Sequence, residues 1–360
     1  MTENCYIHIP FCKSKCNYCA FVSFPCLDKI TAYVYALLKE INERYSGEPL
    51  KTLYFGGGTP SLLPINLFEK IIRKFNLAND AEVTIELNPD DVTEELVAKY
   101  IDLGVNRFSL GLQSFDDDIL KICGRRHNSV VAINAIKAIK AAGGTNISGD
   151  LIYGLPSQSI ACFKKDLEIL VAMPVTHISL YGLKIEEGTP FFETLPKELP
   201  DEDLQADMYI VASEFLKEKG FLQYEISNFA KVDCESRHNL NYWDNNSYYG
   251  FGLSAHGYVD GFRYYNSSDM EVYLEKPHIS EYAHHVTKQE CLEEEIFLGM
   301  RRVAGINIPA INKKFDIDFM EKYSCVIEKY VGEFIEISGS NIKFTTKGFM
   351  LSNVILAEFI

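Results

Sequence analysis

The sequence contains no apolar run that approaches the roughly 20 residues needed to cross a bilayer. We therefore expect no transmembrane segment and at most peripheral contact with a membrane. It also shows no secretory signal, because a strand-like pattern begins within a few residues of the start. Positive charge is scarce, since 35 Lys and Arg face 50 Asp and Glu and the formal net charge is −15. Phosphate backbones repel such a protein on average, so nucleic acid is not expected as a partner.

Cysteine is present but gives no sign of a disulfide framework. Ten cysteines without a secretory signal indicate a reducing compartment, and a cytoplasmic protein fits. Three of them, Cys12, Cys16 and Cys19, follow the spacing Cys-x-x-x-Cys-x-x-Cys. Three thiolates can hold three irons of a 4Fe-4S cluster, which usually takes four cysteines, so one iron keeps an open coordination position.

The open iron predicts a small-molecule ligand, and with this spacing the expected one is S-adenosylmethionine. Its amino and carboxylate groups would chelate the iron, and an electron passed to the sulfonium would release a 5′-deoxyadenosyl radical. Two alternatives stand beside this interpretation. Cys26 could be a fourth ligand, although it follows Pro25 and lies outside the tight spacing. A structural zinc site is disfavoured, because zinc normally takes four protein ligands.

The first half of the chain alternates strand-like apolar runs with helix-period segments. The predicted strands are residues 5–9, 51–55, 83–87, 107–112, 146–151 and 177–181, and the predicted helices between them are residues 29–44, 67–75, 93–103, 130–141 and 161–170. Repeated βαβ units predict an α/β fold with a parallel sheet. Six units are too few to close an eight-stranded barrel. We therefore expect an open (β/α)6 three-quarter TIM-like barrel over residues 1–182.

The regular alternation stops after residue 182. Residues 183–289 are expected to form a barrel extension and connecting segment, with a helix at 201–219 and one strand at 221–229. Residues 290–360 predict a small C-terminal α+β domain. Its pattern is helices at 292–303 and 318–330, a hairpin at 334–344 and a closing helix from Thr346, which suggests a winged-helix-like arrangement.

Polar and glycine-rich segments follow the predicted strands, where such a fold places its chemistry. The Gly-Gly-Gly-Thr-Pro run at 56–60 could bring backbone amides close to a ligand. Glu86 could accept bonds from ribose hydroxyls, and Arg125 could bind a carboxylate if it is not simply a surface residue. Gln113 and Asp150 close apolar strands, and capping of the next helix is the competing interpretation for both.

Several of these segments together resemble one family. Tyr-Ile-His-Ile-Pro-Phe-Cys, Gly-Gly-Gly-Thr-Pro, Gly-Leu-Gln-Ser-Phe, Gly-Arg-Arg-His and Asp-Leu-Ile-Tyr-Gly-Leu-Pro are similar to motifs of the coproporphyrinogen-dehydrogenase group of the radical S-adenosylmethionine superfamily. The resemblance runs over essentially the whole chain. It implies cluster ligation by the three cysteines and S-adenosylmethionine contacts at nine positions: Tyr6, Tyr18 (through its carbonyl), Gly57, Gly58, Thr59, Glu86, Gln113, Arg125 and Asp150.

Two branches of this group differ in function. The dehydrogenases carry an extra cysteine two places after the third ligand, where this chain has Phe21, and a longer segment ahead of the motif. The HemW-type heme chaperones have Phe there, and they also show segments similar to His238-Asn-Leu-Asn-Tyr-Trp243 and to residues 250–257. The resemblance thus implies a chaperone that binds heme and delivers it to recipient hemoproteins. The alternative is an oxygen-independent coproporphyrinogen III dehydrogenase or another radical enzyme acting on a tetrapyrrole.

The resemblance also implies where heme binds. His238 offers an imidazole to heme iron, and Tyr242 and Trp243 offer flat apolar surfaces to the porphyrin. Without the resemblance, His238 would be interpreted as a hydrogen-bonded structural histidine. His256 is a second candidate, and the His284-His285 pair is expected at the solvated surface. The sequence is compatible with a homodimer but does not give the oligomeric state.

Overall fold

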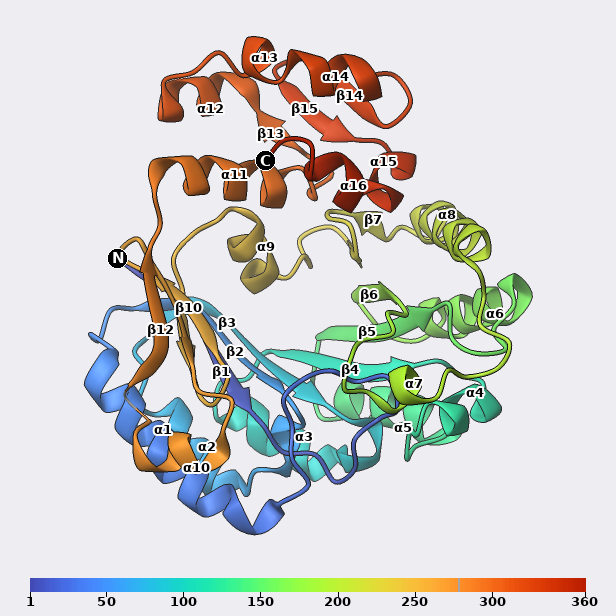
Figure 1. The fold of residues 1–360 in the computed structure, drawn as a ribbon. Coiled ribbons are helices and arrows are strands. Elements are labelled where there is room, and N and C mark those ends of the chain that lie inside the picture. Colours follow the sequence, from blue (N-terminus) through green and yellow to red (C-terminus); the bar gives the residue numbers. More distant parts are fainter. Residues whose placement is uncertain (278) are drawn as a thin grey trace.

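A curved parallel sheet forms the centre of the computed structural model, which describes residues 1–277 and 279–360 (Figure 1). Its six central strands occur in chain order, and each is parallel to the next. All six coincide with predicted strands: β1 (Asn4–Ile9), β2 (Leu50–Gly57), β3 (Leu77–Leu87), β4 (Arg107–Gln113), β5 (Asn146–Tyr153) and β6 (His177–Gly182). The prediction of repeated βαβ units is confirmed.

Helices cover the outer side of this sheet, as both views show. They are α1 (Ile30–Arg44), α2 (Ile65–Ile72), α3 (Glu94–Asp102), α4 (Asp117–Ile122), α5 (Ser129–Ala141) and α6 (Ile160–Val171). Because side chains alternate along a strand, one face of each strand packs under the helices and is apolar, as with Ile7, Phe55 and Ile85. The inner face is polar, and it carries Thr52, Glu86 and Asp150.

The barrel is open, as predicted. The sheet order is β7-β8-β6-β5-β4-β3-β2-β1-β9, and the two end strands do not pair with each other. At one end the short strand β9 (Tyr249–Phe251), which the sequence did not reveal, lies parallel to β1. At the other end β8 (Asn228–Ala230) lies antiparallel to β6, and β7 (Leu222–Gln223) pairs with β8.

The single strand predicted at residues 221–229 is wrong. The structure has two short strands there, β7 and β8, separated by residues 224–227. The backbone between them pairs elsewhere, since Ile226 N donates to Arg301 O over 2.9 Å and Glu225 forms a bridge with Arg302. A tertiary contact with the C-terminal part of the chain therefore interrupts the strand.

A second sheet of three antiparallel strands lies beside β9, and the sequence did not reveal it either. It consists of β10 (His256–Val259), β11 (Phe262–Asn266) and β12 (Ser280–His285), and α10 (Met270–Glu275) connects the last two. The helices α7 (Pro190–Glu193), α8 (Glu202–Glu218) and α9 (Arg237–Trp243) precede it. The predicted helix at 201–219 is thus confirmed as α8.

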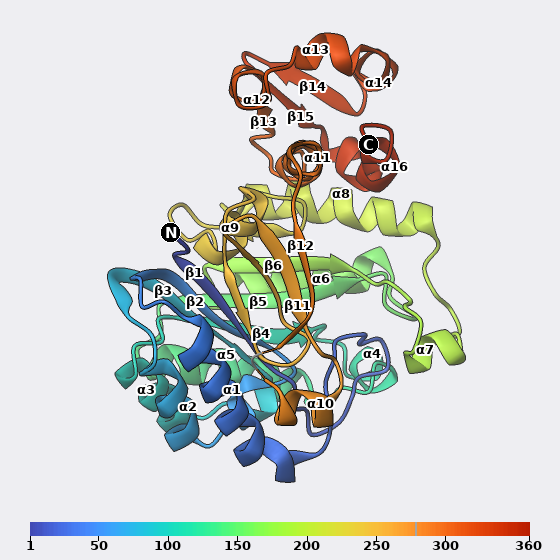
Figure 2. The same cartoon turned by 60° about the vertical axis from the view of Figure 1, so that its left-hand side comes forward.

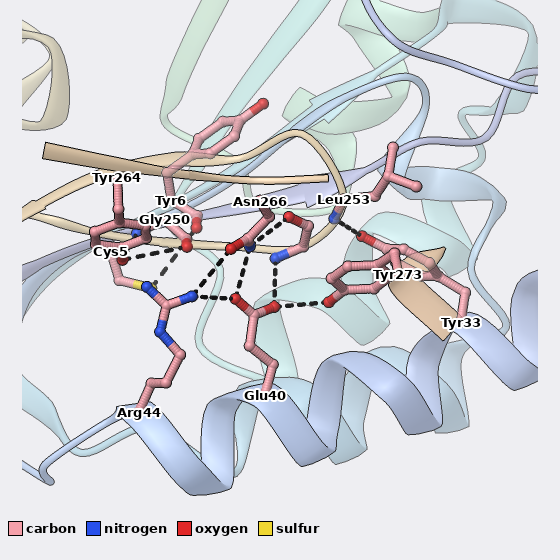
Figure 3. A network of polar contacts seen from close by, with 11 residues as sticks. Cys5, Tyr6, Tyr33, Glu40, Arg44, Gly250, Leu253, Tyr264, Asn266 and Tyr273 are labelled. Atoms are coloured by element: carbon pink, nitrogen blue, oxygen red, sulfur yellow. Dashed lines mark hydrogen bonds and ion pairs between the residues drawn. The ribbon is translucent and has the colours of Figure 1, made fainter. Parts of the chain in front are cut away.

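A buried carboxylate fastens the second sheet to helix α1 (Figure 3). Glu40 accepts hydrogen bonds from Tyr273 Oη over 2.7 Å, Asn266 Nδ2 over 2.7 Å and Gly252 N over 2.9 Å. It also forms an ion pair with Arg44 over 2.9 Å. Burial raises the pKa of Glu40 to about 7, against the effect of these donors. Four donors around one buried carboxylate hold residues far apart in the chain in a single arrangement.

The C-terminal segment has its own hydrophobic core and packs next to α8 through Tyr209 (Figure 2). Its order is α11 (Lys288–Gly299), β13 (Ile306–Asn307), α12 (Ile308–Phe315), α13 (Phe319–Lys322), α14 (Ser324–Tyr330), β14 (Ile335–Ser338), β15 (Asn341–Phe344), α15 (Thr346–Met350) and α16 (Ser352–Leu356). The predicted hairpin β14–β15 is present, and β13 joins it in a three-stranded sheet beside the helices, which agrees with a winged-helix-like fold.

Two predicted C-terminal helices are each divided in the structure. The helix predicted at 318–330 breaks at Tyr323, whose φ of −112° and ψ of 18° leave the helical region. The closing helix breaks in the same way at Leu351. Among the described residues, no helix combines the length and apolar character that a membrane span requires. The domain boundaries at 182 and 289 stay predictions.

Candidate functional site

Arg125 lies at the centre of the predicted site, beyond the end of α4. One of its guanidinium nitrogens, Nη1, donates to Cys16 Sγ over 3.4 Å. The other, Nη2, donates to Asn88 Oδ1 over 2.8 Å and to Gly111 O over 2.5 Å. Burial opposes the charge, but Tyr18 and Cys16 raise the pKa of Arg125 above its ordinary value. A permanently charged group therefore touches the cysteine loop.

Asn88 connects the cysteine loop to the glycine-rich turn. Its Nδ2 donates to Thr59 Oγ1 over 2.8 Å, while its Oδ1 accepts from Arg125. Thr59 Oγ1 lies 3.5 Å from Cys12 Sγ. Cys12, Thr59, Asn88, Arg125 and Cys16 are thus joined by contacts, although they come from four separate parts of the chain. Sequence reasoning did not select Asn88, even though it follows β3 at the carboxyl end.

The glycine-rich turn presents its backbone without side chains. Gly57 has a φ of +110°, which favours glycine. A Cβ atom at Gly57 would lie 2.5 Å from the His8 ring, and one at Gly58 would lie 2.6 Å from Phe11 O. Both positions therefore require glycine for steric reasons. The turn keeps partial access to solvent, so its backbone can approach a ligand closely.

Glu86 closes this turn from the neighbouring strand. Its Oε2 accepts from Gly57 N over 3.1 Å, and its Oε1 accepts from Tyr54 Oη over 2.8 Å. Burial raises the pKa of Glu86 to about 7. The charge of Asp150 also raises this pKa, whereas the hydrogen bonds from Tyr54 and Gly57 lower it. The side chain lies inside the barrel yet remains partly accessible to solvent. It can accept hydrogen bonds from a ligand when it is ionised.

The remaining predicted contacts lie on the same rim. Asp150 accepts bonds from Ser109 Oγ over 3.1 Å and from Ser148 Oγ over 3.2 Å, and burial raises its pKa. Gln113 has a φ of 71°, in the left-handed region. Its Nε2 lies against Gly111, where an added Cβ atom would be only 3.0 Å away. Tyr6 Oη lies 3.0 Å from His8 Nδ1, a partner that the sequence did not suggest.

The three predicted cluster ligands are free thiols on one partly exposed loop. Burial raises the pKa of Cys19, and the neighbouring sulfurs of Cys16 and Cys12 add to the effect. In the part of the chain that the structure describes, no three His, Cys, Asp or Glu side chains form a group that could hold a metal ion. Cluster ligation therefore stays a prediction.

The donor set nevertheless fits an iron–sulfur cluster better than zinc. Three cysteines share one loop, and the alternative fourth ligand, Cys26, packs against the hydrophobic core. Arg125 touches Cys16 with one nitrogen and leaves its buried Nε without a hydrogen-bond partner among the described residues. A buried unpaired donor at the edge of such a loop indicates a missing acceptor. A carboxylate of a bound ligand would satisfy it.

His238 lies inside the barrel rather than at a surface. Its side chain is buried, with 1% exposure for the residue, and it stacks on Tyr54 with ring centroids 5.0 Å apart. Nδ1 lies 2.7 Å from Thr52 Oγ1 and Nε2 lies 2.8 Å from Tyr242 Oη. Burial, with Arg107, lowers its pKa to about 3. Both ring nitrogens are engaged, so His238 has none to offer iron, which matches the alternative of a hydrogen-bonded structural histidine.

A second buried carboxylate holds the helix that carries His238. Glu82 on β3 accepts from Arg237 N and from His238 N, each over 3.0 Å. An anion at a helix N-terminus satisfies amides that have no partner in the helix. Glu82 therefore fixes α9 against the inner face of the sheet. Sequence reasoning missed both Glu82 and Thr52, because neither belongs to a motif.

A cavity of about 470 Å³ adjoins the other side of α9. Its lining is mainly apolar and includes Tyr242, Tyr248 and Phe297, together with Arg263 and Glu294. Tyr242 thus connects His238 to this cavity, while Trp243 is half-buried nearby in the chain. No residue of the cysteine loop lines the cavity. A flat apolar ligand suits these walls.

Comparisons with known proteins identify the fold and the superfamily. Residues 6–170 match the model of the Radical SAM superfamily, and residues 286–351 match that of the HemN C-terminal domain. Coproporphyrinogen III oxidase (HemN) from Escherichia coli, a radical SAM enzyme, has the same fold. The TM-score is 0.87 at 20% identity, over 99% of this chain and 90% of that one. The fold and the three-cysteine loop define a radical S-adenosylmethionine protein.

Curated relatives specify the family within this class. The heme chaperone HemW of Lactococcus lactis is 36% identical over 99% of this chain and 97% of its own length. The heme chaperone HemW of Bacillus subtilis is 34% identical over 99% of both chains. The chain therefore belongs to the HemW family. The radical SAM class implies a 4Fe-4S cluster and S-adenosylmethionine as its cofactors.

Proposed function

We propose that this protein is a heme chaperone that binds a 4Fe-4S cluster, S-adenosylmethionine and heme, and delivers heme to hemoproteins. The relatives named for this activity cover nearly the whole chain. The observation that carries the proposal is the connected set Cys12, Thr59, Asn88, Arg125 and Cys16. It brings the predicted cluster loop and the predicted S-adenosylmethionine rim into one site.

The cluster would be held by Cys12, Cys16 and Cys19, and when bound it supplies an electron to S-adenosylmethionine. Arg125 donates to the sulfur of Cys16 and so ties the cysteine loop to the rim. Its guanidinium, held at the rim by Asn88 and Gly111 O and partly accessible to solvent, would bind the methionine carboxylate. Phe21 is 68% exposed beside this loop, at the place where dehydrogenases carry an additional cysteine. The loop therefore lacks that thiol.

S-adenosylmethionine would lie along the carboxyl ends of the strands. The backbone of Gly57, Gly58 and Thr59 approaches the methionine end, and ionised Glu86 accepts from the ribose hydroxyls. The other expected contacts surround this position and are Tyr6, Tyr18, Gln113 and Asp150. Of the nine residues, all except Thr59 keep partial access to solvent. That access favours contact with a ligand over a purely structural role.

Heme would contact the segment that contains His238, Tyr242 and Trp243. In this proposal Tyr242 meets the porphyrin at the cavity, and His238 holds the Tyr242 hydroxyl in place from the interior. Recipient hemoproteins are the inferred partners. Ten free cysteines are compatible with work in a reducing compartment such as the cytoplasm. A homodimer is compatible with these features and is tested by the solution mass of the reconstituted protein.

One reconstituted, oxygen-protected sample tests the function in two assays. Hemin titration should give a saturable shift of the Soret band, and coproporphyrinogen III should remain unconverted under strict anaerobiosis. The shared fold with the E. coli oxidase does not decide the point, because one fold hosts several activities. Product formation from coproporphyrinogen III would favour the dehydrogenase alternative. Absence of a Soret shift would contradict the chaperone assignment.

A further inference from the structure

A row of aromatic rings and imidazoles crosses the second sheet on one face. His256 on β10, Tyr265 on β11 and Tyr282 on β12 are register partners across the three strands. The ring centroids of His256 and Tyr265 lie 5.3 Å apart, and those of Tyr265 and Tyr282 lie 5.2 Å apart in a stacked arrangement. His284 continues the row, 6.2 Å from Tyr282 and also stacked. We call these four residues the aromatic ladder.

The two faces of this sheet have different surroundings. On the face opposite the ladder, Tyr264 and Asn266 are buried, and Asn266 donates to Glu40 of α1. On the ladder face, His256 is exposed, Tyr282 keeps 44% exposure, and Tyr265 and His284 are half-buried, so the row is at least partly accessible along its whole length. Aromatic residues are normally covered where a sheet packs on a core. A row of them left open, with an imidazole at each end, is suited to a flat metal-bearing ligand.

His284 has the environment of a metal ligand. Its Nε2 lies 3.0 Å from both carboxylate oxygens of Glu290 on α11. Within the part of the chain that the structure describes, no hydrogen bond engages its Nδ1. A histidine that binds a metal through one nitrogen usually donates the other N–H to a carboxylate, which orients the ring and makes it a better donor. His238 differs, because both of its nitrogens are bonded inside the protein.

The cavity beside α9 is linked to the ladder through Arg263. Arg263 is the register partner of His284 on the neighbouring strand, and it lines that cavity together with Tyr248. Arg263 forms an ion pair with Glu294 over 2.8 Å, and Glu294 also lines the cavity. Both Glu290 and Glu294 belong to α11. The open imidazole and the apolar cavity are therefore neighbours along one continuous surface.

We propose that the aromatic ladder receives heme and that His284, supported by Glu290, is the residue that binds the heme iron. This inference rests on the proposed function and specifies its ligand site. The porphyrin lies across the outward edges of the Tyr282 and Tyr265 rings, whose faces are turned toward their neighbours in the ladder, and it extends toward Arg263. His238 then acts as a positioning residue for Tyr242 instead of binding iron.

Hemin titration of three single variants tests this assignment. His284→Ala should lose the Soret spectrum of histidine-ligated hemin and weaken binding by at least about tenfold, the equivalent of 1.4 kcal/mol. His285→Ala is the matched control, since it changes the next residue on the opposite face of the same strand, and its spectrum should equal that of the wild type. His256→Ala should change affinity by less than His284→Ala does, and imidazole added to His284→Ala should restore the spectrum.

Glu290→Gln gives a readout that a merely structural role would not affect. Glutamine can keep the hydrogen bond and the helix cap at Thr287, so the fold is preserved. Loss of the negative charge makes His284 a weaker electron donor, and the midpoint potential of the bound heme should therefore rise.

The outcomes separate the two proposals. A wild-type spectrum in His284→Ala, or its loss only in His256→Ala or only in His285→Ala, overturns the assignment of His284 while heme binding itself stands. An unchanged potential in Glu290→Gln removes Glu290 from the site. No Soret shift in the wild-type protein overturns the proposed function and this inference together.

Discussion

The inner face of the barrel carries two groups of polar residues that differ in their access to solvent. At the carboxyl ends of the strands, Glu86, Gln113, Arg125 and Asp150 are all partly accessible. Around α9, Thr52, Glu82 and His238 have exposures of 1%, 6% and 1%. Both groups are polar and lie within one fold, so polarity alone does not identify a ligand site.

The two groups differ in whether the protein itself satisfies their hydrogen bonds. The groups at α9 bond mainly to one another, as His238 does with Thr52 and Tyr242. At the carboxyl ends, Nε of Arg125 has no partner among the described residues, and Glu86 is partly accessible to solvent. We therefore expect substitutions at the carboxyl ends to change cofactor binding, and substitutions around His238 to change stability. The following predictions test this contrast, beginning with the largest effect.

Replacement of a predicted cluster ligand should have the largest effect. Cys16→Ala should abolish cluster formation after anaerobic reconstitution, because two thiolates cannot replace three. Iron and sulfide content and the visible absorption spectrum measure this directly. Cys26→Ala is the matched control and should retain the cluster, since Cys26 packs against the core. An intact cluster in Cys16→Ala would reject the assignment of this ligand.

Substitution of His238 should mainly reduce stability. His238→Ala removes the partner of the Tyr242 hydroxyl and one of the two partners of the Thr52 hydroxyl, which still bonds to Asn4, and it opens a space against Tyr54; together these changes cost about 3 kcal/mol of unfolding free energy. Urea unfolding measures the loss. His285→Ala at the exposed surface should change the midpoint little. Equal stability of the two variants would contradict an enclosed, structural His238.

The same residue predicts a dependence of stability on pH. The pKa of His238 is about 3 in the folded protein, against an ordinary value of 6.5. The unfolded chain therefore takes up a proton first, and the stability contributed by neutral His238 is lost as the pH falls from 6.5 toward 3. In His238→Ala this part of the acid sensitivity should disappear. Parallel acid-unfolding curves for the two proteins would refute this origin.

The sequence revealed the barrel but not the second sheet, for a physical reason. The six central strands are apolar on the face that packs under helices. In a strand of five or more residues this gives an apolar pattern that is easily recognised in the sequence. Strands β9 and β10 have only three and four residues, and β11 and β12 carry mainly Tyr, His and polar side chains, so none of them shows that apolar pattern. Their position depends on the contacts of Glu40 with Asn266 and Tyr273, which lie more than 200 residues away in the chain.

The sequence likewise identified some residues of the site and not others. Motifs and strand ends identified Glu86, Arg125 and the glycine-rich turn, because such residues recur where parallel strands end. Asn88, which bridges Thr59 and Arg125, has no motif of its own. For His238, sequence could suggest an available imidazole but could not show that Thr52 and Tyr242 occupy both nitrogens.

Glu86 should make S-adenosylmethionine binding depend on pH. With a pKa of about 7, Glu86 is mostly protonated at pH 6 and loses acceptor strength toward the ribose. Affinity should therefore fall about tenfold from pH 8 to pH 6. Calorimetric titration of the reconstituted protein measures this. Glu86→Gln should bind more weakly at pH 8 and show no such dependence, whereas the exposed control Glu94→Gln should behave as wild type.

Tyr54 contacts both groups of polar residues, and its substitution should have the smallest effect. Its ring stacks on His238 from the enclosed side, and its hydroxyl donates to Glu86 on the accessible side over 2.8 Å. Tyr54→Phe keeps the ring and removes the donor, so the pKa of Glu86 should rise and the pH midpoint of S-adenosylmethionine binding should move upward by less than about one unit. Stability should fall by about 1 kcal/mol. Tyr35→Phe, at an exposed tyrosine, should change neither quantity, and an unshifted midpoint in Tyr54→Phe would show that the two groups are independent.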